Sequence, residues 1–169
     1  YPGPLSYKAV PDRLYRSRGD GTFVDVTETA GLLFPDGRAM SAVASDLNND
    51  GLVDIYVTND ASPNCHWINT GKETFRNDAF LLGTAFGEGG QGASSMGPCV
   101  GDINRDGLLD LYIPDMGYGC LLLNEGEMFV DMTAPSNMAL IAGQYTGWGG
   151  LVFDYDNDGY PDLYLVNSG

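Results

Sequence analysis

The sequence has few basic residues, a single histidine and no long apolar run. It carries eight Lys and Arg residues against 23 Asp and Glu residues, which gives a formal net charge of −15. A protein of that charge is not suited to nucleic acid, whose phosphates are bound by Lys and Arg, or to anionic membrane surfaces. Because no stretch of about 18 apolar residues occurs, we expect no membrane-spanning helix.

Cysteine is also scarce. The three cysteines, Cys65, Cys99 and Cys120, form no CxxC pair and no zinc-binding spacing. Since their number is odd, at least one thiol is expected to be free or to pair with another chain. Cys65 and Cys120 occupy equivalent positions in the repeat described below and are expected to lie too far apart for a disulfide, whereas a bond between Cys99 and Cys120 is left open.

The common catalytic signatures are absent. The sequence has no GxSxG turn, HExxH helix, P-loop or Rossmann fingerprint. Most carboxylates that could act as an acid and base pair fall in the acidic loops described next, and the others show no feature that selects such a pair. We therefore expect a protein that is not an enzyme.

What the sequence does contain is an acidic nine-residue motif that occurs three times and holds ten of the 23 acidic residues. The three copies are DLNNDGLVD at 46–54, DINRDGLLD at 102–110 and DYDNDGYPD at 154–162. A glycine turn followed by a segment centred on Phe recurs in phase with them, at 19–27, 71–79 and 126–133. Features that recur in phase at intervals of 56 and 52 residues indicate an internal repeat.

The segments of the repeat are typical of short strands. The motif copies continue as DIYVTN, DLYIPD and DLYLVN, which are rich in β-branched and aromatic residues. Helical periodicity is almost absent, although residues 134–143 are predicted to hold one helical turn. A hydrophobic content of 43% over 169 residues is typical of a folded domain.

Four short strands in each unit of about 50 residues are typical of a β-propeller blade. The fold class predicted is therefore all-β, with about three four-stranded repeats that form an incomplete propeller. The predicted division is an N-terminal extension at 1–12 and repeats at 13–63, 64–118 and 119–169.

The acidic motif has the oxygen-rich pattern of a calcium loop. Asp or Asn at positions 1, 3 and 5 directs three side-chain oxygens toward one point, Gly at position 6 allows the sharp turn, position 7 offers its carbonyl, and Asp at position 9 completes the set. Oxygen ligands in a flexible loop suit Ca²⁺ better than Mg²⁺ or soft metals. We expect about three Ca²⁺ ions, with these ligands: Asp46, Asn48, Asp50, Leu52 (carbonyl) and Asp54; Asp102, Asn104, Asp106, Leu108 (carbonyl) and Asp110; Asp154, Asp156, Asp158, Tyr160 (carbonyl) and Asp162.

Two other interpretations of the motif fit the sequence less well. An EF-hand requires Glu at position 12, where this sequence has Val57, Ile113 and Leu165, and it requires flanking helices. Asp, Asn and Gly also gather in turns that bind nothing. Three loops that share acids at positions 1, 5 and 9 and Gly at position 6 favour metal binding over that simpler interpretation.

The repeat resembles the FG-GAP/VCBS family, known from integrin α-subunit propellers and secreted bacterial proteins. The stretch GDGTFVDVTETAGL at 19–32, joined to a DxDxDGxxD loop, is most similar to the branch that contains cartilage acidic protein and UnbV. The resemblance covers about residues 13–169 and implies structural calcium loops between two strands of a blade, in an extracellular or periplasmic protein used for adhesion or assembly. Asn at position 3 of the first two loops departs from the pattern and is expected to weaken those sites slightly.

Three repeats are too few to close a propeller, which needs at least about four blades. We therefore expect a part of a longer protein or a subunit completed by its neighbours. The expected function is a calcium-binding, non-catalytic interaction or assembly module. Its partners would be other protein chains, the rest of a larger propeller or further copies of itself. The alternative is the propeller part of a secreted protein that binds or processes carbohydrate, with a glycan as ligand.

Overall fold

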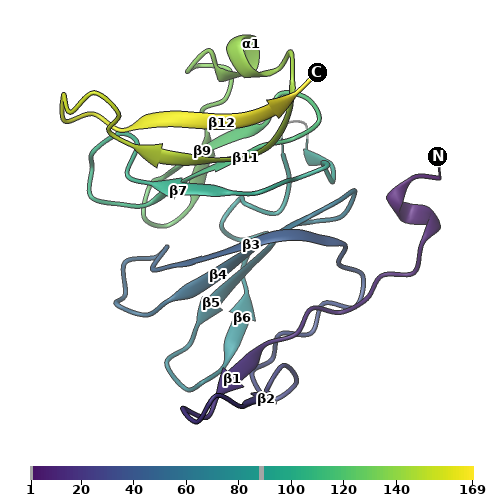
Figure 1. Ribbon diagram of the computed structural model, residues 1–169. Coiled ribbons are helices and arrows are strands. Elements are labelled where there is room, and N and C mark those ends of the chain that lie inside the picture. Colours follow the sequence, from purple (N-terminus) through teal and green to yellow (C-terminus); the bar gives the residue numbers. More distant parts are fainter. Residues whose placement is uncertain (1, 88–89) are drawn as a thin grey trace.

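Figure 1 shows the computed structural model, which describes residues 2–87 and 90–169. Almost all regular structure in these ranges is antiparallel β, in two sheets of four strands and two of two strands. A short 3-10 turn (η1, Pro4–Ser6) and one short helix (α1, Met138–Ala142) complete it. The predicted all-β class is confirmed, and α1 lies within the residues 134–143 that were predicted to hold a helical turn.

The first sheet has the order β3-β4-β5-β6. Each strand is hydrogen-bonded to the next along the chain, so the sheet is a simple meander. Its strands are β3 (Ala39–Ser45), β4 (Asp54–Asn59), β5 (Cys65–Asn69) and β6 (Phe75–Asn77). In the register of β4 and β5, Tyr56 lies opposite His66.

The second sheet repeats this arrangement with β7, β8, β9 and β10 as its four neighbours. Its strands are β7 (Cys99–Gly101), β8 (Asp110–Ile113), β9 (Cys120–Asn124) and β10 (Phe129–Asp131). Tyr112 of β8 lies opposite Leu121 of β9, which is the pairing that the repeat predicts from Tyr56 and His66.

Two hairpins lie at the two ends of the described chain (Figure 1). The N-terminal hairpin consists of β1 (Tyr15–Ser17) and β2 (Phe23–Asp25), and the C-terminal hairpin of β11 (Thr146–Phe153) and β12 (Asp162–Ser168). Each forms a sheet of only two strands. The described residues therefore form two complete blades and two half-blades.

The core lies between the blades. Tyr56 of the first sheet and Leu47 of the loop between its first two strands pack against Leu111, Ile113 and Leu122 of the second sheet, and all five are buried. Burial of apolar side chains between neighbouring sheets provides most of the stability of such an arrangement.

The sheets are out of phase with the units read from the sequence. The first sheet spans residues 39–77 and the second spans 99–131, so each joins the last two strands of one predicted unit to the first two of the next. The unit boundaries at 13–63, 64–118 and 119–169 stay a prediction about the sequence repeat. Each observed sheet begins two strands after the start of a predicted unit.

Candidate metal centres

Each acidic loop connects the first two strands of a blade. The loop at 46–54 joins β3 to β4, the loop at 102–110 joins β7 to β8, and the loop at 154–162 joins β11 to β12. The glycine at position 6 has a positive φ in all three, as in Gly51 with φ 86°. L-residues with a side chain rarely adopt this conformation, so the glycine is required for the turn.

The carboxylate at position 1 organises the loop backbone. Asp46 accepts hydrogen bonds from the amides of Asp50 and Gly51 at 3.0 and 2.8 Å. Asp102 and Asp154 accept the corresponding pairs of amides in their own loops. The amide of the residue at position 7 donates to the carboxylate at position 5 at 2.8 Å in every loop; these residues are Leu52, Leu108 and Tyr160.

Position 3 distinguishes the third loop from the other two. In the first loop the side-chain amide of Asn48 donates to the carboxylate of Asp50 at 2.9 Å. Asn104 makes the same bond to Asp106 at 2.8 Å. An ionised carboxylate cannot donate in this way, so Asp156 at position 3 of the third loop gives Asp158 no side-chain donor, and Asp158 keeps only the backbone amide of Tyr160.

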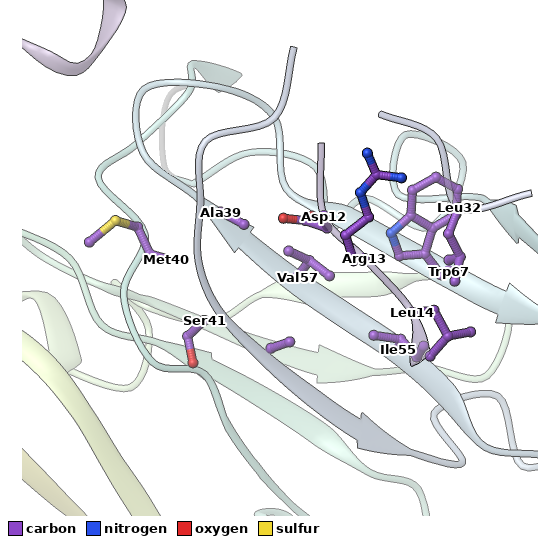
Figure 2. Close-up of a pocket in the computed structure, with 11 residues that line it drawn as sticks. Asp12, Arg13, Leu14, Leu32, Ala39, Met40, Ser41, Ile55, Val57 and Trp67 are labelled. Atoms are coloured by element: carbon purple, nitrogen blue, oxygen red, sulfur yellow. The ribbon is translucent and has the colours of Figure 1, made fainter. Parts of the chain in front are cut away.

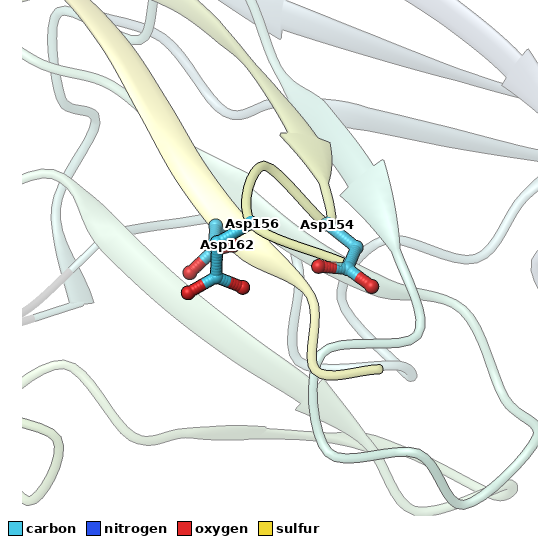
Figure 3. Close-up of side chains that lie close together, drawn as sticks. All are labelled: Asp154, Asp156 and Asp162. Atoms are coloured by element: carbon cyan, nitrogen blue, oxygen red, sulfur yellow. The ribbon is translucent and has the colours of Figure 1, made fainter. Parts of the chain in front are cut away.

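The third loop brings three carboxylates together. Asp154, Asp156 and Asp162 each place an oxygen within 4.8 Å of the others (Figure 3). Like charges at this separation repel each other, and a divalent cation among them would relieve the repulsion. The chemistry and spacing of these oxygens fit a hard cation.

Position 9 has a second role that the sequence did not reveal. Asp54 is fully buried and accepts the amide of Leu47 at 3.1 Å and the amide of Asn69 at 2.8 Å. Asp110 likewise accepts the amides of Ile103 and Asn124, at 2.7 and 2.8 Å. Each of these carboxylates therefore fastens its loop to the third strand of the same blade.

Burial raises the pKa of Asp54 and of Asp110 above 3.8, although the amide donors oppose the shift. Asp162 differs from both, because it is only half-buried and accepts the amide of Tyr155 at 3.0 Å. Its sheet ends with β12, and no third strand in the described ranges follows to supply a second amide.

Sequence reasoning missed the partners of these two aspartates. Asn69 and Asn124 donate their backbone amides to the buried carboxylates, and their side-chain oxygens accept the amides of Gly71 and Gly126. The available signal was the Asn that precedes the turn glycine by two residues in both units. All fifteen predicted ligand residues lie in the described ranges, five in each loop, and their role as ligands stays a prediction. Among the described residues, a close group of three acidic side chains occurs in the third loop and not in the first two.

The second and third loops lie next to each other. Arg105 of the second loop places its guanidinium carbon 4.7 Å from the ring centre of Tyr160 in the third. Asp102, Asp106 and Asp154 line a groove of about 670 Å³ between the two loops. Cation–π contact with a ring therefore holds a basic group in a region that is otherwise acidic.

None of the three cysteines lies in these loops. Cys65 and Cys99 are free, buried thiols, and burial raises their pKa values to about 12 and about 11. The two thiols are therefore poor nucleophiles at neutral pH. No helix in the described ranges has the length and apolar composition needed to cross a lipid bilayer.

Comparison with known families agrees with the arrangement of blades and loops. A family model described as an FG-GAP-like repeat matches residues 6–57 and 46–113. The chain belongs to this FG-GAP-like repeat family. The family resemblance inferred from the sequence motifs is thereby confirmed.

Three curated relatives that the chain resembles carry the name cartilage acidic protein 1. The chain is 28% identical to the human protein over 170 residues, 27% to the mouse protein over 174 and 29% to the Xenopus tropicalis protein over 176. Each match covers 94% of this chain and 24–25% of the relative. The chain thus spans about a quarter of the length of these relatives.

Proposed function

We propose that this chain is a calcium-stabilised, non-catalytic interaction module from an exported protein. In this role the ions fasten the loops that join the first two strands of each blade, and the faces and edges of the blades bind other protein. The observation that carries the proposal is the convergence of Asp154, Asp156 and Asp162 within 4.8 Å, with no donor from position 3 between them.

The chemistry of the donor set supports calcium. Ca²⁺ takes about six to eight oxygen ligands and tolerates irregular geometry, whereas Mg²⁺ requires a stricter octahedron. In the first two loops, Asn48 and Asn104 would turn their amide oxygens toward the ion and give up the bonds to Asp50 and Asp106. We propose one ion in each loop, about three in all, with the weakest binding in the first two.

Two features support a module that acts outside the cell. The relatives are named as cartilage proteins and as acidic proteins, and this chain carries a net charge of −15. Calcium-binding modules of extracellular proteins typically work at the high calcium concentrations found outside cells, which suits loops that are largely exposed to solvent, as these are. A non-catalytic role is supported by the buried position of Cys65, Cys99 and His66.

Titration calorimetry on chelator-stripped protein tests this function, with melting curves recorded with and without calcium. We expect about three binding events and a rise in melting temperature with Ca²⁺ that Mg²⁺ does not reproduce. Asp156→Ala should remove one event, whereas Asp36→Ala, which changes an exposed carboxylate outside the loops, should remove none. A chain that melts cooperatively and binds no calcium would contradict the proposal.

A further inference from the structure

Four buried residues connect the first two acidic loops by an unbroken run of hydrogen bonds. They are Asp54 at position 9 of the first loop, Leu47 at position 2 of that loop, Asn124 of β9, and Asp110 at position 9 of the second loop. The exposed fraction of each of the four is 0–1%. Water therefore has almost no access to the groups that join the two loops.

The run consists of three hydrogen bonds, two made by backbone amides and one by a side chain. The amide of Leu47 donates to Asp54 at 3.1 Å, and the carbonyl of Leu47 accepts the side-chain amide of Asn124 at 2.8 Å. The backbone amide of Asn124 in turn donates to Asp110 at 2.8 Å. Only two residues therefore separate a predicted calcium ligand of one blade from a predicted calcium ligand of the next.

The carboxylate of Asp110 can bind a cation without giving up these bonds. One of its oxygens accepts the amide of Asn124, and the other accepts the amide of Ile103 at 2.7 Å. An ionised carboxylate offers about four acceptor positions, so about two are left for other partners. As a calcium ligand, Asp110 would hold Asn124 in place as well as the second loop.

Asn69 holds the position in the first sheet that Asn124 holds in the second. The side-chain amide of Asn69 donates to the carbonyl of Val53 at 3.0 Å, within its own blade. Asn124 makes the equivalent bond to Leu109 at 3.2 Å and, in addition, the bond to Leu47 of the neighbouring blade. The two asparagines therefore share a local role, and Asn124 also links two loops.

Sheet packing explains the difference between the two asparagines. On the first sheet, Ile55 and Trp67 line a pocket of about 440 Å³ (Figure 2). The equivalent residues of the second sheet, Leu111 and Leu122, are buried in one cluster with Leu47 of the first blade. This contact brings the carbonyl of Leu47 within reach of the asparagine of β9. The bond between the two loops is therefore a product of blade packing.

We propose that Asn124 is a positioning residue that couples the first two loops, so that calcium binding in one raises the calcium affinity of the other. This coupling rests on the calcium function proposed above. Asp110, once held as a ligand, restrains Asn124, which restrains Leu47 and through it Asp54. Part of the conformational freedom of the first loop is then already lost before that loop binds calcium. Coupling of this kind is positive, and it acts equally in both directions.

A calcium titration followed by NMR measures the two loops separately. The amides of Gly51 and Gly107 donate to the carboxylates at position 1 of their own loops, at 2.8 and 3.0 Å, so their signals report binding in the first and second loop. Asp106→Ala removes a predicted ligand of the second loop. It should lower the calcium affinity reported by Gly51 about fivefold or more. In an Asn124→Ala chain the same change should alter that affinity less than about twofold.

The reverse titration does not depend on the Asn124→Ala variant folding. Asp50→Ala removes a predicted ligand of the first loop and should lower the affinity reported by Gly107 by the same factor, since coupling between two binding sites is reciprocal. Affinities at Gly51 and Gly107 that do not respond to loss of the other loop, in chains that keep Asn124, would overturn the coupling.

Comparison of the two backgrounds separates coupling from a purely structural role. The lost charge of Asp106 acts through space with and without Asn124, so its effect cancels in the comparison, as does any general destabilisation by Asn124→Ala. Asn69→Ala is the matched control and should leave the fivefold effect intact. Equal effects of Asp106→Ala with and without Asn124 would overturn the role of Asn124 while calcium binding stands. No calcium response in either loop would overturn the calcium function and the coupling together.

Discussion

The side-chain amide of Asn124 donates a hydrogen bond of 2.8 Å to the carbonyl of Leu47, linking the third strand of the second blade to the acidic loop of the first. Asn124 also donates to the carbonyl of Leu109 in its own blade at 3.2 Å. The residue is 1% exposed, so both bonds are made away from water. A loop predicted to bind calcium is thus held by the neighbouring blade as well as by its own.

This relationship predicts the effect of Asn124→Ala on stability. The change leaves the buried carbonyl of Leu47 without its donor and should lower the free energy of unfolding by about 2–3 kcal/mol. Asn69→Ala is the matched control, because Asn69 keeps the local bond to Val53 at 3.0 Å but is only half-buried. Urea denaturation of both variants should show a smaller loss of unfolding free energy for Asn69→Ala. Equal losses would contradict a role for the inter-blade bond.

Removing one negative charge from the third loop should stabilise the calcium-free chain but weaken the binding of calcium to that loop. Asp156→Asn creates the donor that Asn48 and Asn104 provide in the other loops and removes a repelling carboxylate. Without calcium the melting temperature should rise by about 2 °C or more, while the calcium affinity of this loop should fall about tenfold. Asn104→Asp should produce the reverse pattern in the second loop. Unchanged calcium affinity in both variants would contradict this account.

His66 should make the protein sensitive to acid. It is buried, its Nδ1 lies 3.2 Å from the hydroxyl of Thr84, and its Nε2 has no hydrogen-bond partner in the described ranges. Burial lowers its pKa from 6.5 to about 4, with the charge of Asp78 opposing the shift. The unfolded chain therefore takes up a proton near pH 6.5 while the folded chain does not, so stability present above pH 6.5 is lost as pH falls toward 4.

The loss of unfolding free energy caused by His66 should be on the order of 3 kcal/mol as pH falls from above 6.5 to about 4. His66→Leu introduces the residue found at the equivalent position 121 and should remove this contribution. The raised pKa values of Asp54 and Asp110 act in the opposite direction, since their protonation stabilises the fold as pH approaches 3.8. The variant should therefore gain unfolding free energy relative to wild type on acidification from pH 7 to 4, because only wild type contains His66. A difference independent of pH would contradict a buried, neutral His66.

The buried thiols should resist modification in the folded chain. Cys65 and Cys99 are 1% and 3% exposed, and their raised pKa values keep them protonated at neutral pH. Iodoacetamide at pH 7.5 should therefore leave both largely unlabelled until urea unfolds the protein, as read from the two peptides by mass spectrometry. Rapid labelling of either in the native chain would show that its blade opens readily.

The repeat, the short strands and the shape of the acidic loops could be predicted from the sequence. These features depend on residues that are close in the chain. Gly51 and its equivalents meet the demand of a local turn, and short runs rich in β-branched and aromatic residues beside each loop predict the strands. The family followed from the same local patterns.

The grouping of the strands into blades and the roles of several side chains became apparent in the folded structure. A repeat can be cut at any point along its period, so the sequence could not show that a blade begins at β3, within a predicted unit. The partners of Asp54 lie in a different strand, and the burial of Tyr56 beside the exposure of Tyr164 depends on whether another blade covers each face. Contacts between segments distant in the chain settle these properties, because pairing and packing exclude water only once the blades have assembled.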